Sequence, residues 1–170
     1  MDTPVRKSTL ELDLTYHQIV IEEFNMDGMV DASLAIHNGL VGVELGRAVV
    51  LTGVHTGSVV VTVELFESEP ALGELDAWDE IVDVTLDSPR GQLVIHGLMS
   101  DIPEELPILS HHGPGIYRLR VYARGRDQAI NSTDETIECY RFEIWPSHAL
   151  PELIHKQSDN YGSEVRSRGS

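Results

Sequence analysis

The sequence predicts an all-β protein: an antiparallel β-sandwich of the jelly-roll type, with seven to nine strands and at most one or two short helices. Three observations support this prediction. Short runs of alternating apolar residues recur along the chain, Gly, Pro, Asp and Ser separate the runs, and no long helical pattern alternates with them. Evenly spaced strands with turn residues between them are typical of two packed antiparallel sheets, whereas a parallel sheet would need intervening helices.

The first predicted strands lie on either side of a bend. Apolar residues alternate from Leu10 to Tyr16 and again, in the opposite parity, from Ile19 to Ile21. Because one extra residue turns the following side chains to the other face, this switch predicts a bulge or tight bend near His17. A further strand covers Val41–Leu45, and Ala48–Thr52 either continues it or forms a separate strand.

The later strands alternate more clearly. Val59–Leu65 is followed by Trp78–Leu86, which carries acidic residues on its other face. A turn at Ser88–Gly91 leads into Gln92–Met99, because Pro presets its backbone angle and Gly relieves strain. The last predicted strands are Leu119–Ala123 and Thr136–Trp145.

The remaining segments lack this period. We expect one short helix within Asp27–Asn38, because Gly39 is a stop signal, and a long loop over Asp101–Gly115, which is rich in Pro and Gly. The pattern is lost after Pro146. We therefore assign residues 1–150 to a single β-sandwich domain and residues 151–170 to a flexible C-terminal tail.

The chain is strongly acidic. Its 170 residues carry a net charge of −16, and 41% of them are hydrophobic, which is enough for a core. Such a field repels the phosphates of nucleic acids and of anionic membranes. The composition predicts no nucleic-acid binding and no membrane binding, and it favours a basic protein as partner.

The acidic charge is concentrated in one segment. Between Glu64 and Asp87 there are nine acidic residues and no Lys or Arg. A solvated acidic face is the simpler interpretation, and a docking surface that speeds association with a cationic protein is the functional one. The residues of this segment predicted to contact a partner are Glu64, Glu67, Asp76, Asp79, Glu80, Asp83 and Asp87.

The compartment is expected to be the cytoplasm. The N-terminal residues contain no apolar stretch of signal-peptide length, and no segment approaches the roughly 20 apolar residues that span a membrane. The single cysteine, Cys139, excludes an internal disulfide.

No residue pattern predicts a catalytic or metal site. His111 and His112 are adjacent, and neighbours in an extended chain point in opposite directions, so we expect a poor chelate. The chain lacks HExxH, CxxC and GxSxG motifs and the glycine patterns of nucleotide-binding loops. We therefore predict no catalytic residue, no metal and no cofactor, and only tertiary structure can show whether scattered histidines meet.

One basic cluster interrupts the acidic sequence. Arg118, Arg120 and Arg124 share a predicted strand face with Tyr122. They form either an anion-binding platform or a set of cross-strand pairs with acidic residues. With 28 acidic residues in the chain, pairing is the favoured interpretation.

Several segments resemble the competence protein J family. The match begins with LELDLTYHQIVI at Leu10–Ile21, in which Tyr16, His17 and Gln18 agree best, and continues through Gly39–Gly53, Val59–Phe66 and PGIYRLRVYA at Pro114–Ala123. The chain departs from the family after Ala123. The strand at Thr136–Trp145 and the tail after it have no counterpart in that resemblance. The segments WDEIVDV and GPGIYRLRVYARGRD are more similar to a broader group of uncharacterised bacterial proteins with this fold.

The resemblance implies the family's fold and its role, inhibition of the DNA-entry nuclease of natural transformation. Tyr16, His17 and Gln18 are candidates for a structured binding site, although a corner tyrosine bonded to backbone is the favoured interpretation of Tyr16. We therefore predict a non-catalytic acidic module that inhibits a basic nuclease. The alternatives are a β-sandwich that binds a small molecule or carbohydrate through Trp78, Trp145 or Tyr122, and an enzyme with a spatially assembled His/acid site.

Overall fold

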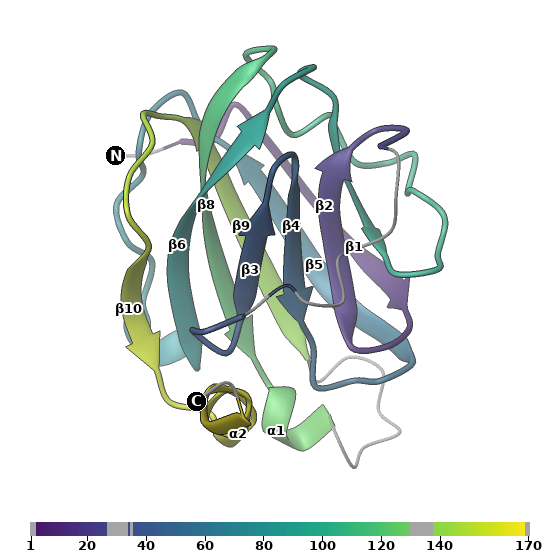
Figure 1. Cartoon of the computed structure of the whole chain (residues 1–170), viewed down its shortest axis with the longest axis vertical. Helices are drawn as coiled ribbons and strands as arrows, with labels where there is room; N and C mark the ends of the chain where they lie inside the picture. The colour runs from purple at the N-terminus through teal and green to yellow at the C-terminus, as the bar shows by residue number, and fades with distance from the viewer. Residues whose placement is uncertain (1–2, 27–33, 35, 130–137, 169–170) are drawn as a thin grey trace.

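The computed structural model describes residues 3–26, 34, 36–129 and 138–168, which form two β-sheets (Figure 1). The described residues contain ten strands, more than the seven to nine predicted. The six-stranded sheet contains, in spatial order, β1 (Arg6–Leu14), β5 (Gly57–Leu65), β9 (Cys139–Pro146), β8 (Gly115–Arg124), β6 (Glu80–Ser88) and β10 (Leu153–Gln157). The four-stranded sheet contains β3 (Val41–Glu44), β4 (Arg47–Leu51), β2 (Gln18–Glu23) and β7 (Leu93–Gly97). The helical elements are η1 (Leu75–Ala77), α1 (Arg126–Ala129) and α2 (Asn160–Arg168).

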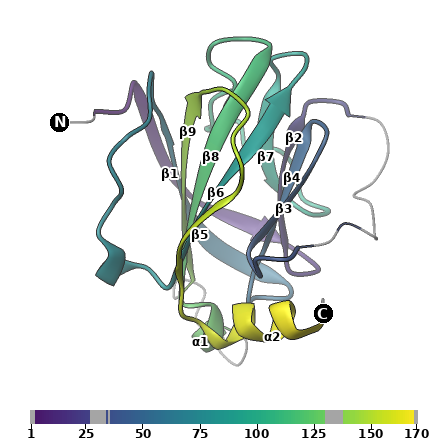
Figure 2. The same ribbon diagram turned by 60° about the vertical axis from the view of Figure 1, so that its left-hand side comes forward.

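One hydrophobic core joins the two sheets. In β5, Val59, Val61 and Val63 are fully buried, as the period of two requires when one face of a strand is covered. Ile19 and Ile21, from the four-stranded sheet, belong to the same cluster. The sheets form two layers with this cluster between them (Figure 2). The predicted all-β class and the buried face of Val59–Leu65 are confirmed.

The bend predicted near His17 carries the chain from one sheet to the other. Tyr16 and His17 have φ values of 55° and 62°, a left-handed conformation that is uncommon outside glycine. The turn is fixed because His17 N–H donates to His55 O at 3.1 Å and Thr52 N–H donates to His17 O at 2.8 Å. Strand β1 precedes the turn in the six-stranded sheet, and β2 follows it in the four-stranded sheet. The switch of parity in the sequence therefore marks a change of sheet.

Glycines allow the chain to reverse and the sheets to meet. At Gly46, with φ of 73°, β3 turns into β4, so Ala48–Thr52 belongs to a separate strand. At Gly97 a Cβ would lie 1.8 Å from Asp13 O and 2.6 Å from Leu14 Cα. Only glycine lets the end of β7 pass so close to the backbone of β1.

One pairing departs from the predicted antiparallel arrangement. Strands β5 and β9 run parallel, with Val61 opposite Tyr140 and Val63 opposite Phe142. Parallel neighbours need a long connection, and here the chain forms β6, β7 and β8 before it returns as β9. Alternation alone does not specify strand direction, which explains the difference.

The C-terminal segment, expected to be a tail outside the domain, contributes a strand and a helix to it. β10 pairs with β6 and becomes the edge of the six-stranded sheet. Helix α2 lies beside α1 at one end of the sheets (Figure 1). It is attached through Arg126, which is fully buried and binds Asp159 with bonds of 2.7 and 2.8 Å. Asp159 also accepts the N–H of Gly162 at 2.8 Å, so it caps the helix.

Three predicted segments lie outside the strands: a turn, a long loop and a short helix. The turn at Ser88–Gly91 is confirmed by the bond from Gly91 N–H to Ser88 O at 3.3 Å, and the segment from Asp101 to Pro114 contains no helix or strand, as predicted. The predicted helix at Asp27–Asn38 lies mostly outside the described residues; its described end, His37 and Asn38, forms a turn.

Candidate functional site

The acidic segment predicted to face a partner is only partly exposed. Glu64, Glu80 and Asp83 are 4%, 0% and 1% exposed, so the expectation that they face solvent is wrong. The other four predicted contact residues are exposed or half-buried: Glu67, Asp76, Asp79 and Asp87.

Glu64 and Asp83 are buried because the outer face of the six-stranded sheet is covered and carries a row of charged residues, whereas Glu80 is buried against α2. The strand register aligns Glu64, Glu143, Arg120 and Asp83 across four strands. Arg120 donates to both oxygens of Asp83, at 2.8 and 3.2 Å, and lies 3.5 Å from Glu143. Burial alone would lower the pKa of Arg120, but its bond to Asp83 raises it. The row therefore holds strands together and is not open to a partner.

The proposed anion platform is not formed. Arg118 and Arg120 are each 3% exposed. Arg118 donates to the backbone carbonyls of Leu150 and Pro151, and Arg124 is exposed but stacks over Trp78 at 4.9 Å. Pairing with acidic residues on neighbouring strands, the favoured interpretation, is confirmed for Arg120.

The aromatic residues considered for ligand binding are mostly part of this covered face. Tyr122 is fully buried and Trp145 is 3% exposed. The hydroxyl of Tyr122 donates to Glu143 at 2.6 Å and accepts from Gly73 N–H at 2.9 Å. Burial, together with the bond to Glu143, raises the pKa of Tyr122 to about 12. Trp78 packs against Tyr122 with ring centroids 5.3 Å apart, so these rings stack on one another rather than on an open face.

The tripeptide Tyr16-His17-Gln18 presents one residue to solvent. Tyr16 is 59% exposed, so the interpretation as a buried corner tyrosine is wrong. His17 is half-buried, and its Nδ1 lies 2.8 Å from Thr52 O. The preceding residue, Thr15, bonds to Leu98 O through its hydroxyl at 2.8 Å. This bond places the turn next to the loop that follows β7.

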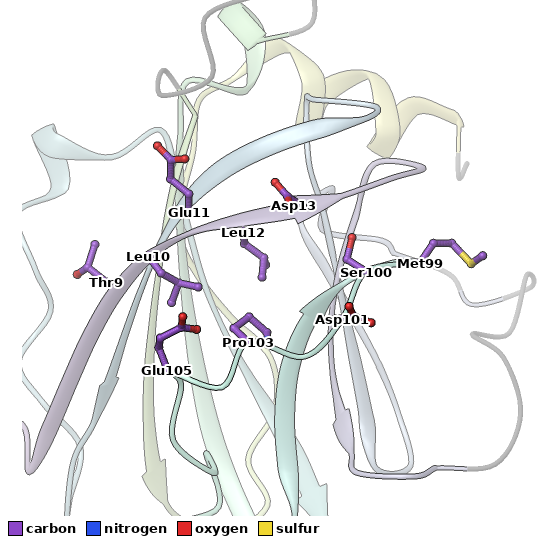
Figure 3. A pocket seen from close by; sticks show the side chains of 10 residues that line it. All are labelled: Thr9, Leu10, Glu11, Leu12, Asp13, Met99, Ser100, Asp101, Pro103 and Glu105. Carbon is purple, nitrogen blue, oxygen red and sulfur yellow. The ribbon is translucent and has the colours of Figure 1, made fainter.

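That loop and strand β1 enclose a groove, which we call the acidic groove. It has a volume of about 630 Å³ and lies beside β1, an edge strand of the six-stranded sheet (Figure 3). Glu11 and Asp13 point from one side of the strand, and Leu10 and Leu12 from the other, toward the loop (Figure 3). The lining residues are Thr9, Leu10, Glu11, Leu12, Asp13, Met99, Ser100, Asp101, Pro103 and Glu105.

The groove carries negative charge and an exposed apolar end. Its four carboxylates, on Glu11, Asp13, Asp101 and Glu105, are all exposed, and none of the ten lining residues is basic. Met99, with φ of 65°, is 74% exposed. Edge strands leave every second pair of backbone groups unpaired. The arrangement can therefore bind an extended basic segment by charge and by main-chain bonds.

Sequence reasoning did not single out this groove. Glu11 and Asp13 alternate with leucines in β1, which indicates an outward face, but Asp101 and Glu105 come from a loop far along the chain. Only the approach of this loop to β1 brings the two pairs together.

A second cluster lies on the loops around β8. Glu67, His111 and His112 each offer a ligand atom, and these atoms lie within 4.8 Å of one another. The two histidines occupy the centre of a turn, closed by the bond from Gly113 N–H to Ser110 O at 3.0 Å. Neighbouring side chains in such a turn share a side, and the imidazole centroids are 4.8 Å apart. The prediction that they diverge assumed an extended chain and is wrong.

The chain is similar in structure to two solved proteins. No helix among the described residues is long and apolar enough to cross a membrane. No family model matches the sequence, and no curated protein is significantly similar to it. ComJ from Bacillus subtilis, described as an inhibitor of the DNA degrading activity of NucA, superposes with a TM-score of 0.59 at 18% identity, over 86% of this chain and 99% of ComJ. Crocagin biosynthetic gene J superposes with a TM-score of 0.52 at 16% identity, over 85% of this chain and all of that protein. The two-sheet structure described above is therefore the ComJ-like fold.

Proposed function

We propose that this protein is a non-catalytic binding module that inhibits a basic protein, and that its target is a nuclease. The acidic groove beside β1 carries the proposal, because it combines four exposed carboxylates with an open strand edge. Its fold is that of ComJ, a nuclease inhibitor.

The charge of the groove matches the surface of such a target. A nuclease holds the DNA backbone in a basic cleft, and an acidic protein can occupy that cleft in place of phosphates. Glu11 and Asp13 lie two residues apart on the side of the strand that points away from the loop, and Asp101 and Glu105 lie in the loop on the other side, so carboxylates flank both sides of the strand (Figure 3). Tyr16 and Met99, both exposed near the same loop, supply apolar contact area.

The exposed part of the acidic segment, around Glu69, Glu74 and Asp76, is a competing surface for the same partner. This surface is equally negative, but it lies on a loop and contains no edge strand to which a partner could add. We place the primary contact at the groove and treat this loop as a source of long-range attraction.

Two variants of equal charge distinguish the surfaces. The groove variant replaces Glu11, Asp101 and Glu105 by Lys, and the loop variant replaces Glu69, Glu74 and Asp76 by Lys; all six residues are exposed. The measurements are DNA cleavage and association kinetics with purified NucA and with basic nucleases of the organism that carries this chain.

We expect the wild type to bind one of these nucleases and to inhibit its cleavage of DNA. Association should slow as salt rises, and the groove variant should lose on-rate by about tenfold or more because steering is lost. The loop variant should lose less and keep its inhibition. Equal effects of both variants would place the contact elsewhere, and no binding to any basic nuclease would refute the proposal.

A further inference from the structure

We infer that Glu67, His111 and His112 form a binding site for Zn²⁺. Two imidazoles and one carboxylate are a donor set that zinc accepts, with the fourth position left to water. The inference does not depend on the proposed function, because the site shares no residue with the acidic groove.

The donor atoms are close to the spacing that zinc requires. Ligands at about 2.1 Å in a tetrahedral arrangement lie about 3.4 Å apart. The atoms here lie within 4.8 Å of one another, and His112 Nε2 is in direct contact with Glu67 Oε2. The side chains of His112 and Glu67 are 44% and 59% exposed, so modest rotations bring all three donors onto one ion.

Hydrogen bonds that involve buried residues fix the backbone of the turn that carries the two histidines. The hydroxyl of Tyr117, which is 1% exposed, accepts from His112 N–H at 2.9 Å and donates to Gly113 O at 2.6 Å. Leu109, just before the turn, is fully buried and bonds to Leu93 O at 2.8 Å. The backbone of the site is thus in place before an ion binds.

The surroundings of His111 fit a metal ligand. Its Nε2 lies 2.8 Å from Phe66 O, and its Nδ1 lies 3.2 Å from Leu109 O. A neutral imidazole can donate to only one of these carbonyls, so the other nitrogen presents its lone pair to an oxygen. A shift of the ring that takes this nitrogen off the oxygen relieves the repulsion and frees the lone pair for a cation, and an N–H bond from the other nitrogen to a backbone carbonyl is the arrangement that orients most metal-binding histidines.

Calorimetric titration with ZnCl₂ tests the site. The protein is produced without a metal-affinity tag and treated with a chelator, and the variants are His112→Ala and Glu67→Gln. The controls, His148→Ala and Glu69→Gln, change the same residue types at exposed positions outside the cluster. Circular dichroism confirms that each apo variant is folded.

We expect one Zn²⁺ per chain in the wild type and in both controls. Each site variant should lose affinity by at least about tenfold, the smallest loss seen even for residues that only support metal ligands. Co²⁺ should give the visible absorption of a tetrahedral site, and Mg²⁺, which prefers oxygen ligands, should not bind there. Absence of zinc binding, or equal binding by all variants, would show that His112 and Glu67 form only a surface hydrogen bond.

Discussion

Glu138 is a carboxyl group enclosed where the two sheets meet. It is 1% exposed, and its Oε1 accepts the N–H groups of Gly53 and Val54 at 2.9 and 3.1 Å. Its Oε2 lies 3.1 Å from the hydroxyl of Tyr140, which lies 3.3 Å from Leu51 O. Burial raises the pKa of Glu138 to about 7, although these bonds and Arg126 oppose the shift. The residue therefore changes charge near neutral pH.

The raised pKa predicts a loss of stability as pH rises. Because the folded state holds the proton more tightly than the unfolded state, the contribution of Glu138 is complete below pH 4.5 and is lost as pH rises toward 7. The shift corresponds to about 3 kcal/mol. Glu138→Gln keeps a carbonyl for Gly53 and Val54, and its amide can donate to Tyr140. Chemical denaturation at several pH values should show wild type losing stability relative to the variant over this range. A constant difference between them would contradict the assignment.

At the scale of elements, buried ion pairs attach the C-terminal segment to the sheets. Arg126, from α1, binds Asp159 at the start of α2, and it also donates to Gly39 O at 2.9 Å. Glu80, from β6, accepts the N–H groups of Ser158 and Asp159 at 2.5 and 3.1 Å. Burial, and then the charge of Asp159, raise the pKa of Glu80. Charged side chains and their hydrogen bonds thus hold together α1, α2 and β6, which are distant in sequence.

Removing one partner of this network should be costly. Asp159→Ala leaves Arg126 fully buried without its bidentate carboxylate, and breaking such a pair costs about 3–5 kcal/mol. Asp159→Asn keeps the helix cap and should still lose most of that stability, which separates charge from capping. The measurement is urea unfolding.

The matched control for this experiment is Glu164→Ala. It breaks an exposed pair with Arg168 at 3.4 Å and should change stability by less than about 1 kcal/mol. If Asp159→Ala costs no more than this control, the buried pair does not hold α2.

At the scale of the whole molecule, several arginines are paired with buried carboxylates, whereas many of the other acidic residues lie at the surface. Arg120 and Arg141 bind carboxylates in the charged row on the outer face of the six-stranded sheet. Arg126 binds Asp159 at the start of α2. Many of the remaining acidic residues lie exposed in the acidic groove and in the loop after β5. The net charge of −16 is therefore a surface property that repels itself and attracts basic partners.

This surface repulsion predicts that salt stabilises the fold. Raising NaCl from about 10 to 150 mM shortens the screening length from about 30 to 8 Å, which weakens repulsion between exposed carboxylates while buried pairs are affected little. The melting temperature should rise. The groove variant, with three acidic residues replaced by Lys and a net charge of −10 instead of −16, should show a smaller rise. A melting temperature that falls with salt would mean that exposed ion pairs outweigh repulsion.

The sequence by itself determined the all-β class, the core faces and the bend near His17. These properties depend on local patterns, since alternation with a period of two fixes which side of a strand is apolar, and one shifted residue is visible as a change of parity. It also indicated the ComJ-like fold, through a resemblance of short segments to the competence protein J family, although identity to ComJ over the superposed chain is only 18%.

Only the tertiary structure decided which charges are buried and which face a partner. Asp79, Glu80 and Asp83 look alike in sequence, yet Asp83 lies opposite Arg120 and Glu80 lies beneath α2, whereas Asp79 remains half-buried. The acidic groove joins β1 to a loop far along the chain, and the zinc-site residues meet because a turn replaces an extended segment. Such properties depend on contacts between distant segments, and a local pattern contains no information about what will cover a strand's second face.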